Sequence, residues 1–500
     1  MTLANDYGVL NEGARALLYR RTGMFLDGAF RDAASGKTMD VVDPTTGGVV
    51  ANVPDAGAGD VELAVRSAHR AFRDTAWSGL RPHEREAVIM KLAALVEAEA
   101  DALAQVETVN SGKLIGNTRA FDADFSVHVL RQAAGWATRL SGRMMELAVP
   151  YMPNARFTGS THPRPVGVIG AIVPWNVPLC MAVFKLAPAL ATGCTIVIKP
   201  AERTPLTALR LAELCIEAGI PAGVVNVVTG GATAGQALVE HPLVDKISFT
   251  GSTAVGRRIG ASAGERLIPF CLELGGKSPV VIAPDADLEM AISGAAWAIL
   301  GNHGQNCCAG SRLFVHENHF DQVVEGIAQI AASLVIGPGL DPASTMGPMI
   351  SHEHRDRVVS YVEQARKDGA SLITGGDPLS DDGAYMHPAV IVGAGDGSPV
   401  AQEEIFGPVL TAFRFDDLDD VMPRVNNSQY GLGASIWTRD MATADRFADK
   451  VEAGTVWINN HNTLDCAMPF GGWKQSGFGQ ELGEEGIRAH LKTQARIVRH

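Results

Sequence analysis

Several features that would each point to a class of protein are missing from this sequence. No two cysteines stand in a Cys-x-x-Cys pair, which leaves neither a zinc ribbon nor a dithiol redox motif. No apolar run is long enough to cross a bilayer, and residues 1–21 lack the basic-then-apolar order of a secretory signal. Positive charge is also scarce. With a formal net charge of −13, the chain is expected to bind neither nucleic acid nor an anionic membrane.

The seven cysteines are an odd number spread along the chain, and most are expected to be ordinary buried side chains. This usage favours a reducing compartment, so the protein is expected in the cytoplasm and no metal site is predicted. The length of 500 residues predicts two or three packed units, because a single core rarely grows so large.

Residues 166–300 carry the clearest architecture, because short β-branched runs alternate there with helical patterns. Strands are predicted within VGVIGAIVPW, CTIVIKP, GVVNVVTG and DKISFT, and residues 204–221 have apolar residues at helical spacing. Continuous apolar strands alternating with helices predict an α/β fold with a parallel sheet covered on both faces. Upstream, residues 60–74 and residues 84–107 are each predicted to form an amphipathic helix that covers this sheet.

Two loops after predicted strands are candidates for binding a dinucleotide. The first, Gly251 to Gly256, opens a helix, where backbone N–H groups can bind a phosphate, although a plain tight turn is the alternative. The second places Lys199 and Glu202 just past a strand end, where ligands bind in open α/β sheets. These side chains can hydrogen-bond a ribose, and the carboxylate would repel a 2′-phosphate. The pair therefore favours NAD over NADP, with an exposed ion pair as the alternative.

The stretch GNHGQNCCAGSR, residues 301–312, sets Cys307 and Cys308 side by side among small residues. Small neighbours leave room for a substrate and free backbone N–H groups for an oxyanion. Glu273 lies in the apolar, glycine-rich LELGGKSP, where burial raises a carboxyl pKa toward the range of a general base, and Asn176 in PWNVP offers an amide donor. Thiol, carboxylate, amide and dinucleotide site together favour oxidation of an aldehyde through a thioester.

Eight segments form one ordered pattern along nearly the whole chain, from about Gly23 to the end. They are PWNVP, KPAER, FTGSTAVG, LELGGKSP, GQNCCAGSR, EEIFGPV, NNSQYGLGASIWT and PFGGWKQSGFGQELG. In this order they resemble the hydrolytic, NAD(P)-dependent branch of the aldehyde dehydrogenase family.

The resemblance implies a Rossmann-like parallel-sheet cofactor domain, an α/β catalytic domain and a small β oligomerisation arm. The expected boundaries are 1–141 and 166–276 for the NAD-binding domain, 277–477 for the catalytic domain, and 142–165 and 478–500 for the arm. The C-terminal strand would leave an exposed edge in a single chain, so a homo-oligomer, either a dimer or a tetramer, is expected through it.

The resemblance also implies roles. Cys307 matches the nucleophile, because it is the fourth residue of Gly-Gln-x-Cys, and Cys308 is expected to be a packing residue. The Cys307 thiolate would attack the aldehyde, and the Asn176 amide and the Cys307 N–H would hold the oxyanion of the thiohemiacetal. After hydride passes to the nicotinamide, water activated by Glu273 would hydrolyse the thioester.

Further residues follow from the same matching. Lys185 and Glu481 resemble a pair that carries the proton away from Glu273, with a buried structural ion pair as the alternative. The implied cofactor residues are Trp175, Lys199, Glu202, Gly251, Ser252, Gly256, Glu404 and Phe406.

Six positions are implied to line the substrate tunnel: Val177, Met181, Phe184, Gly301, Leu464 and Phe470. Family members often carry aromatic residues where Val177, Gly301 and Leu464 stand here, so a wide apolar tunnel is expected. It would suit a bulky or aryl aldehyde such as phenylacetaldehyde. No arginine is present to hold a substrate carboxylate, and the aromatic box for a quaternary ammonium group is thin. The alternatives are a broad-specificity aliphatic aldehyde dehydrogenase and a CoA-acylating or thioester-transfer enzyme, which Glu273 disfavours.

Overall fold

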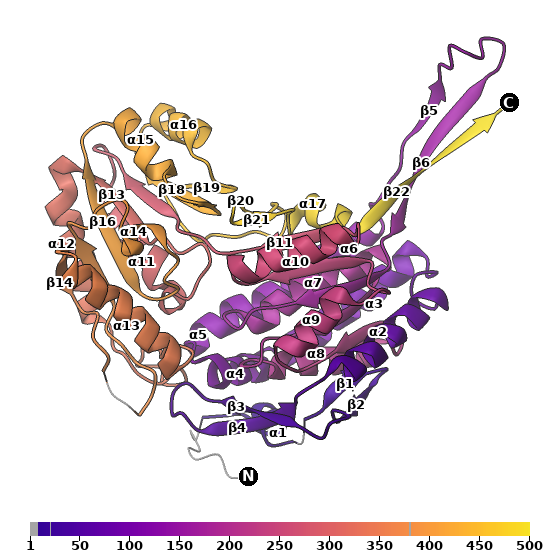
Figure 1. Ribbon diagram of the computed structural model, residues 1–500, viewed down its shortest axis with the longest axis horizontal. Helices are drawn as coiled ribbons and strands as arrows, with labels where there is room; N and C mark the ends of the chain where they lie inside the picture. The colour runs from indigo at the N-terminus through magenta and orange to yellow at the C-terminus, as the bar shows by residue number, and fades with distance from the viewer. Residues whose placement is uncertain (1–8, 21, 380–381) are drawn as a thin grey trace.

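The computed structural model describes residues 9–20, 22–379 and 382–500, and it is an α/β structure built on two large sheets (Figure 1). The sheets have the strand orders β2-β1-β9-β8-β7-β10-β11-β21 and β14-β15-β16-β13-β12-β18-β19. The N-terminal half of the chain forms most of the first sheet and its helices. The second sheet and its helices lie beside it, and a narrow three-stranded sheet projects away from both (Figure 1).

The centre of the first sheet is parallel, as the alternating apolar runs predict. Its parallel strands are β7 (Val168–Ile172), β8 (Thr195–Lys199), β9 (Val225–Val227), β10 (Lys246–Thr250) and β11 (Phe270–Glu273). Antiparallel strands complete the edges: β1 (Met24–Leu26), β2 (Ala29–Arg31) and β21 (Gly477–Phe478).

Helices cover both faces of this sheet, and a separate apolar cluster fills the space on each side. One face is covered by α2 (Ala58–Arg73), α9 (Ala232–Glu240) and α10 (Thr253–Glu265). The other is covered by α3 (Pro82–Ala98), α4 (Ala100–Ser111), α6 (Phe125–Ala137), α7 (Pro178–Thr192) and α8 (Leu206–Ala218). The prediction of a parallel sheet buried on both faces is therefore confirmed.

One predicted helix is wrong in its extent. Residues 84–107 do not form a single amphipathic helix, because the chain breaks at Glu99 between α3 and α4. The Glu99 carboxylate binds the Arg210 guanidinium there, with Oε2 2.8 Å from Nε. Beyond the break nearly every residue of α4 is buried, whereas α3 keeps one exposed side. The change of direction at Glu99 therefore places α4, the second half of the segment, in the interior of the protein.

The second sheet is also parallel except at β14, and helices cover it. Its strands are β12 (Pro279–Ile282), β13 (Arg312–His316), β14 (Ser371–Thr374), β15 (Ala389–Val392), β16 (Val409–Phe415), β18 (Gly433–Trp437) and β19 (Thr455–Ile458). Its helices are α11 (Leu288–Leu300), α12 (Phe320–Ser333), α13 (His352–Lys367), α14 (Pro399–Gln402), α15 (Leu418–Asn426) and α16 (Met441–Lys450).

The projecting sheet joins two segments that are far apart in sequence. Residues 491–499 form β22 (Leu491–Arg499), which pairs antiparallel with β6 (Phe157–Pro165), and β6 pairs with β5 (Met144–Leu147) (Figure 1). The predicted extended C-terminal strand is thus present. The exact domain boundaries given above stay a prediction.

Smaller elements complete the described chain. They are α1 (Glu12–Tyr19), β3 (Thr38–Val42), β4 (Val49–Pro54), α5 (Ile115–Asn117), a π-helical turn (Thr118–Asp124), two 3₁₀ turns (Gly301–Gly304 and Glu317–His319), β17 (Tyr430–Gly431), β20 (Trp473–Lys474) and α17 (Gly483–Arg488). No helix among the described residues combines the length and the apolar character needed to cross a membrane.

A buried arginine ties the second sheet to its covering helix. The Arg312 guanidinium donates to the carbonyl oxygens of Lys277, Arg424 and Val425 at 2.9, 3.1 and 2.8 Å. These contacts link the start of β13 to the segment before β12 and to the end of α15. Burial lowers the pKa of Arg312 to about 10, which leaves it charged at neutral pH.

Replacing Arg312 by methionine removes all three donors from buried carbonyl groups. The Arg424 carbonyl still accepts the Asn427 N–H at 3.2 Å, so two carbonyls, those of Lys277 and Val425, lose their donor outright. Each buried acceptor left without a partner costs about 1–3 kcal/mol, so Arg312→Met is expected to lower the free energy of unfolding by about 2 kcal/mol or more. Arg366→Met is the control, because it breaks an exposed ion pair with Asp377, worth about 1 kcal/mol or less. Urea unfolding measures both. Equal losses of unfolding free energy in the two variants would contradict the stabilising role given to the Arg312 hydrogen bonds.

Candidate active site

The carboxyl ends of the parallel strands β7, β10 and β11 open onto a cleft of about 840 Å³ that helices and loops next to the second sheet complete. Ligands bind at this edge in open α/β sheets. Most of the predicted site residues line the cleft: Trp175, Asn176, Val177, Met181, Phe184, Gly251, Ser252, Glu273, Gly301, Cys307, Glu404, Phe406, Leu464, Phe470 and Glu481. The predicted residues outside its lining are Lys185, Lys199, Glu202 and Gly256.

Cys307 is partly exposed to the cleft, and Cys308 is buried behind it. The Cys308 thiol lies 3.2 Å from Asn462 Oδ1, and the side chain packs with Leu432 and Trp457. The Cys308 thiol and burial together raise the pKa of Cys307 well above its ordinary value. Both effects favour the neutral thiol over the thiolate.

Glu273 ends β11 with its side chain in the cleft. It is only 3% exposed, and its Oε2 atom is buried without a hydrogen-bond partner among the described residues. Burial raises the pKa of Glu273 well above its ordinary value, and the nearby Glu481 carboxylate adds to this shift while Lys185 opposes it. The other oxygen, Oε1, accepts the Cys271 thiol at 4.0 Å, so the carboxyl has the one free oxygen and the raised basicity that a general base requires.

Lys185 and Glu481 form a buried ion pair at the wall of the cleft, in which Glu481 is part of the lining and Lys185 lies outside it. Lys185 comes from α7, and its ammonium also donates to Thr250 Oγ1 at 2.6 Å. Ser248 lies 3.4 Å from the Glu481 carboxylate. The structure therefore brings the predicted pair together, next to Glu273.

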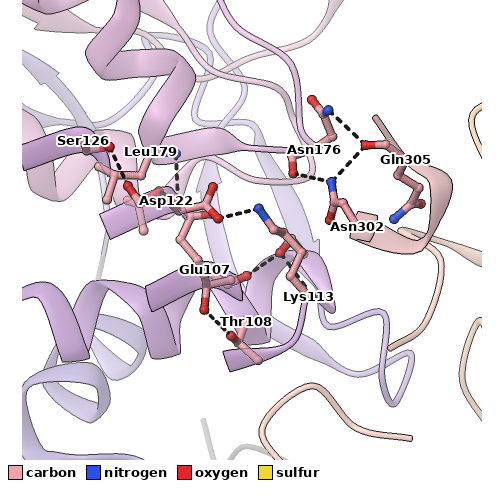
Figure 2. Close-up of polar contacts among 12 residues, drawn as sticks. Glu107, Thr108, Lys113, Asp122, Ser126, Asn176, Leu179, Asn302 and Gln305 are labelled. Atoms are coloured by element: carbon pink, nitrogen blue, oxygen red, sulfur yellow. Dashed lines mark hydrogen bonds and ion pairs between the residues drawn. The ribbon is translucent and has the colours of Figure 1, made fainter. Parts of the chain in front are cut away.

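Asn176 precedes α7, and its Nδ2 atom donates to the Gln305 carbonyl at 3.0 Å (Figure 2). Val177 supplies no side-chain cap for α7. Instead, the fully buried Glu107 of α4 accepts the Leu179 N–H at 2.7 Å (Figure 2). A side-chain oxygen that accepts an N–H at a helix N-terminus is stabilising, and here it anchors the turn that carries Asn176. Sequence reasoning missed Glu107, because no local signal relates positions that are 72 residues apart.

Lys199 and Glu202 lie together where β8 ends. The Lys199 ammonium donates to the Gly230 carbonyl at 2.7 Å and to Glu202 Oε1 at 3.3 Å. Burial lowers the pKa of Lys199, which the Glu202 carboxylate partly offsets. A lysine and a carboxylate are thus held at the sheet edge, near the cleft but outside its lining.

The Gly251–Gly256 loop opens a helix, as predicted. The Ser252 hydroxyl accepts the Val255 N–H at 3.4 Å and caps α10. A side-chain carbon at Gly256 would lie 2.4 Å from Leu274 Cδ2, so the glycine permits α10 to pack directly on the end of β11. The helix N-terminus therefore faces the cleft through residues 251–254.

Glu404 and Phe406 line the same side of the cleft. The Gly276 N–H donates to Glu404 Oε1 at 3.0 Å, and burial raises the pKa of Glu404 to about 7. Phe406 has a left-handed backbone with φ 60°, and its carbonyl lies 2.7 Å from His354 Nε2. Its ring meets Trp175 edge-on at 5.2 Å. His354, which sequence reasoning did not single out, therefore holds this strained residue.

All six predicted tunnel residues lie in the cleft, together with Phe121 and Trp297, which were not predicted. A side-chain carbon at Gly301 would lie 3.4 Å from the Trp297 ring, so the indole occupies the space beside this glycine. Trp297 is 53% exposed although it is aromatic. Trp297 stands four residues before Gly301, and residues at this spacing lie on the same face of a helix, so the sequence could have indicated that Trp297 lies beside the tunnel.

The fold and the cleft are those of a nucleotide-dependent oxidoreductase. A model of the aldehyde dehydrogenase family matches residues 30–495. Phenylacetaldehyde dehydrogenase from Pseudomonas fluorescens is 48% identical and covers 95% of each chain. Mitochondrial benzaldehyde dehydrogenase from Antirrhinum majus is 41% identical and covers 95% of this chain and 88% of its own.

A solved structure agrees with this assignment. The NAD⁺ complex of aldehyde dehydrogenase from Bacillus cereus has a TM-score of 0.95 and 42% identity, over 98% of this chain and 99% of that chain. The chain therefore belongs to the aldehyde dehydrogenase family. The family, fold class and enzyme class predicted from the sequence are confirmed. Among the described residues, no group of histidine, cysteine, aspartate or glutamate side chains could hold a metal ion.

The approach of Gly276 to the cysteine loop can be tested directly. A side-chain carbon at Gly276 would lie 2.2 Å from the Cys307 carbonyl oxygen, so Gly276→Ala must displace the loop. Because a shift of about 1 Å at a reacting group can cost about 10²-fold in rate, a loss of that order in kcat/KM for an aldehyde is expected. The control is Gly264→Ala in α10, where nothing lies within 4 Å. Unchanged kinetics in Gly276→Ala would contradict the contact.

Proposed function

We propose that this protein oxidises a bulky apolar aldehyde, of the aryl class that phenylacetaldehyde represents, to the carboxylic acid with NAD. One observation carries the proposal: Cys307, Glu273 and Asn176 share a single cleft whose walls are largely apolar. The similarity to a phenylacetaldehyde dehydrogenase and a benzaldehyde dehydrogenase supports the substrate class.

The residues at the sheet edge fit a dinucleotide. The capped N-terminus of α10 suits the pyrophosphate, because its first N–H groups have no partner within the helix. Lys199 and Glu202 suit the hydroxyls of the adenosine ribose, and the half-exposed Glu202 carboxylate disfavours the 2′-phosphate of NADP. Trp175 would contact the adenosine-phosphate half, and Glu404 with Phe406 would flank the nicotinamide riboside. Bound NAD supplies the hydride acceptor.

The first half of the reaction rests on the thiol. The Cys307 thiol loses its proton to water, the thiolate Sγ bonds to the aldehyde carbon, and the electron pair of the carbonyl π bond moves to the oxygen, which becomes an oxyanion. The Asn176 Nδ2–H and the Cys307 N–H donate to that oxygen. One such donor is worth about 10²–10³ in rate. Loss of hydride from the same carbon then leaves a thioester on Cys307.

The second half rests on Glu273. Its free Oε2 accepts a proton from water, the water oxygen bonds to the thioester carbon, and the C–S bond breaks to return the Cys307 thiolate. Lys185 and Glu481 then carry the proton away from Glu273. The buried ion pair at the wall of the cleft and its effect on the Glu273 pKa support this role. Because Glu273 activates water, it favours hydrolysis of the thioester over transfer of the acyl group to CoA.

The cleft also supports a bulky substrate. Trp297, which fills the space beside Gly301, and Phe121 add aromatic surface to a tunnel that Val177 and Leu464 leave wide. An aryl ring can stack there edge-on or offset, which contributes about 0.5–1.5 kcal/mol beyond its burial.

The assembly and the compartment are also proposals. Ile497 and Val498 of β22 are exposed apolar residues on an edge strand, which supports a homo-oligomer formed through the arm. All seven cysteines are free thiols, which supports a reducing, cytoplasmic location. A molar mass in solution that is a multiple of 52.8 kDa tests the assembly.

The substrate class is tested by following NADH formation with phenylacetaldehyde and with acetaldehyde. The native protein is expected to prefer phenylacetaldehyde and NAD, and Cys307→Ser is expected to lose turnover. Trp297→Ala should raise KM for phenylacetaldehyde about tenfold with little change for acetaldehyde, and Trp297→Phe should restore it. A preference for acetaldehyde would contradict the substrate class. Turnover by Cys307→Ser would contradict the mechanism.

The raised pKa of Glu273 predicts the pH dependence of kcat. The base is the deprotonated form, and burial holds the proton on the carboxyl to a higher pH than usual. The rate should therefore climb with pH well above about pH 5, where an ordinary glutamate is already ionised. Glu273→Gln should lower kcat by about 10²–10⁴ and flatten this rise, whereas Glu240→Gln, an exposed change, should do neither. A rate already maximal near pH 5 would refute the assignment.

A further inference from the structure

The loop before Cys307 has an unusual backbone. Asn302, His303 and Gly304 are three consecutive left-handed residues, with φ of 49°, 57° and 68°. Two of them carry side chains, for which this conformation is strained, and asparagine tolerates it better than most residues. The conformation must therefore be held by contacts elsewhere.

His303 holds the loop from the side away from the cleft. Its Nδ1 atom lies 3.1 Å from the Pro348 carbonyl, and its Nε2 atom accepts the Gly347 N–H at 3.0 Å. Burial lowers the pKa of His303 to about 4, so the ring stays neutral and keeps both contacts at neutral pH. Both ring nitrogens are occupied, which leaves His303 no role as a base for the Cys307 thiol.

Asn302 makes its side-chain hydrogen bonds on the side of the loop that faces the cleft. Its Nδ2 atom donates to the Gln305 carbonyl at 2.9 Å and to the backbone carbonyl of Asn176 at 3.2 Å (Figure 2). Its Oδ1 atom is buried and has no partner among the described residues. The orientation of this amide therefore depends on the two carbonyls that its nitrogen faces.

The Gln305 carbonyl receives both amides. It accepts Asn302 Nδ2 at 2.9 Å and Asn176 Nδ2 at 3.0 Å (Figure 2). The two ends of an asparagine amide have nearly the same shape, and an acceptor beside one end selects the NH₂ group there. The Gln305 carbonyl thus turns the NH₂ group of Asn176 toward the cysteine loop. One of its hydrogens is used, and the other is free for an oxyanion.

We propose that Asn302 is a positioning residue for the Asn176 amide. It holds the backbone of Asn176 and the carbonyl that orients its side chain, so the donor is in place before substrate arrives. The proposal rests on the oxyanion role of Asn176 given under the proposed function. Asn302 itself donates to no reacting atom.

The test compares Asn302→Asp and Asn302→Gly in the native protein and in the Asn176→Ala variant. The aspartate keeps the shape but loses the donor, and the glycine removes the side chain while tolerating the left-handed backbone. Asn459→Gly is the matched control. Asn459 is also left-handed, with φ 55°, and makes two side-chain hydrogen bonds of 3.0 Å to Thr438, outside the cleft lining. For each protein, kcat and KM for phenylacetaldehyde, KM for NAD and the thermal unfolding midpoint are measured.

We expect Asn302→Asp to lower kcat about 10²-fold and Asn302→Gly about tenfold, with KM for NAD unchanged, because an oxyanion donor is worth about 10²–10³. The unfolding midpoint of Asn302→Gly should match that of Asn459→Gly, which keeps native kcat. In the Asn176→Ala background neither Asn302 change should lower kcat more than about threefold, since the donor is already gone.

Losses at Asn302 that are equally large in both backgrounds would overturn the proposal, because they would not pass through Asn176. Native kcat in both Asn302 variants would overturn it as well. If Asn176→Ala alone kept the native rate, the oxyanion role in the proposed function would fail, and the inference with it. Additive losses, by contrast, would overturn the inference alone.

Discussion

Two glycines allow the segment that leaves the first sheet to lie against the parts of the cleft that the second sheet carries. A side-chain carbon at Gly275 would lie 2.3 Å from Glu404 Oε2, and one at Gly276 would lie 2.2 Å from the Cys307 carbonyl. Only because both positions lack a side chain can Glu273, at the end of β11, share a cleft with Cys307. The glycines in LELGGKSP are therefore a requirement of close backbone approach, and the relative placement of base and nucleophile depends on them.

Around that contact the interior holds ionisable groups whose charged forms burial makes costly. One oxygen of Glu273 has no hydrogen-bond partner among the described residues, Lys185 and Glu481 are paired next to it, and burial of Glu107 raises its pKa to about 8. Such groups do not stabilise a fold by themselves, and strongly perturbed groups gathered in a cleft are typical of functional sites. The buried Lys185 ties the middle of α7 to Thr250 at the end of β10, and the buried Glu107 holds the first turn of α7, which follows Asn176 directly.

The sequence predicted those parts of the molecule that are encoded locally. Apolar runs predicted four parallel strands of the first sheet, and two strand-end motifs, the Gly251–Gly256 loop and Lys199 with Glu202, were placed at one edge, because the carboxyl ends of parallel strands meet there. Long-range contacts could not be predicted. The Glu107 cap on α7 joins positions 72 residues apart, and Asn302 reaches a carbonyl 126 residues away. The break at Glu99 was missed for the same reason, since its carboxylate partner, Arg210, lies 111 residues further along.

The central claim is that Cys307 carries the acyl group and Glu273 releases it. The most direct measurement is to mix Glu273→Gln with phenylacetaldehyde and NAD, quench, and analyse its peptides by mass spectrometry while recording the NADH formed. The account predicts a burst of about one NADH for each subunit, followed by slow turnover, with a phenylacetyl group on the peptide that contains Cys307. No acyl group on that peptide, or a burst that persists in Glu273→Gln with Cys307→Ser, would contradict it.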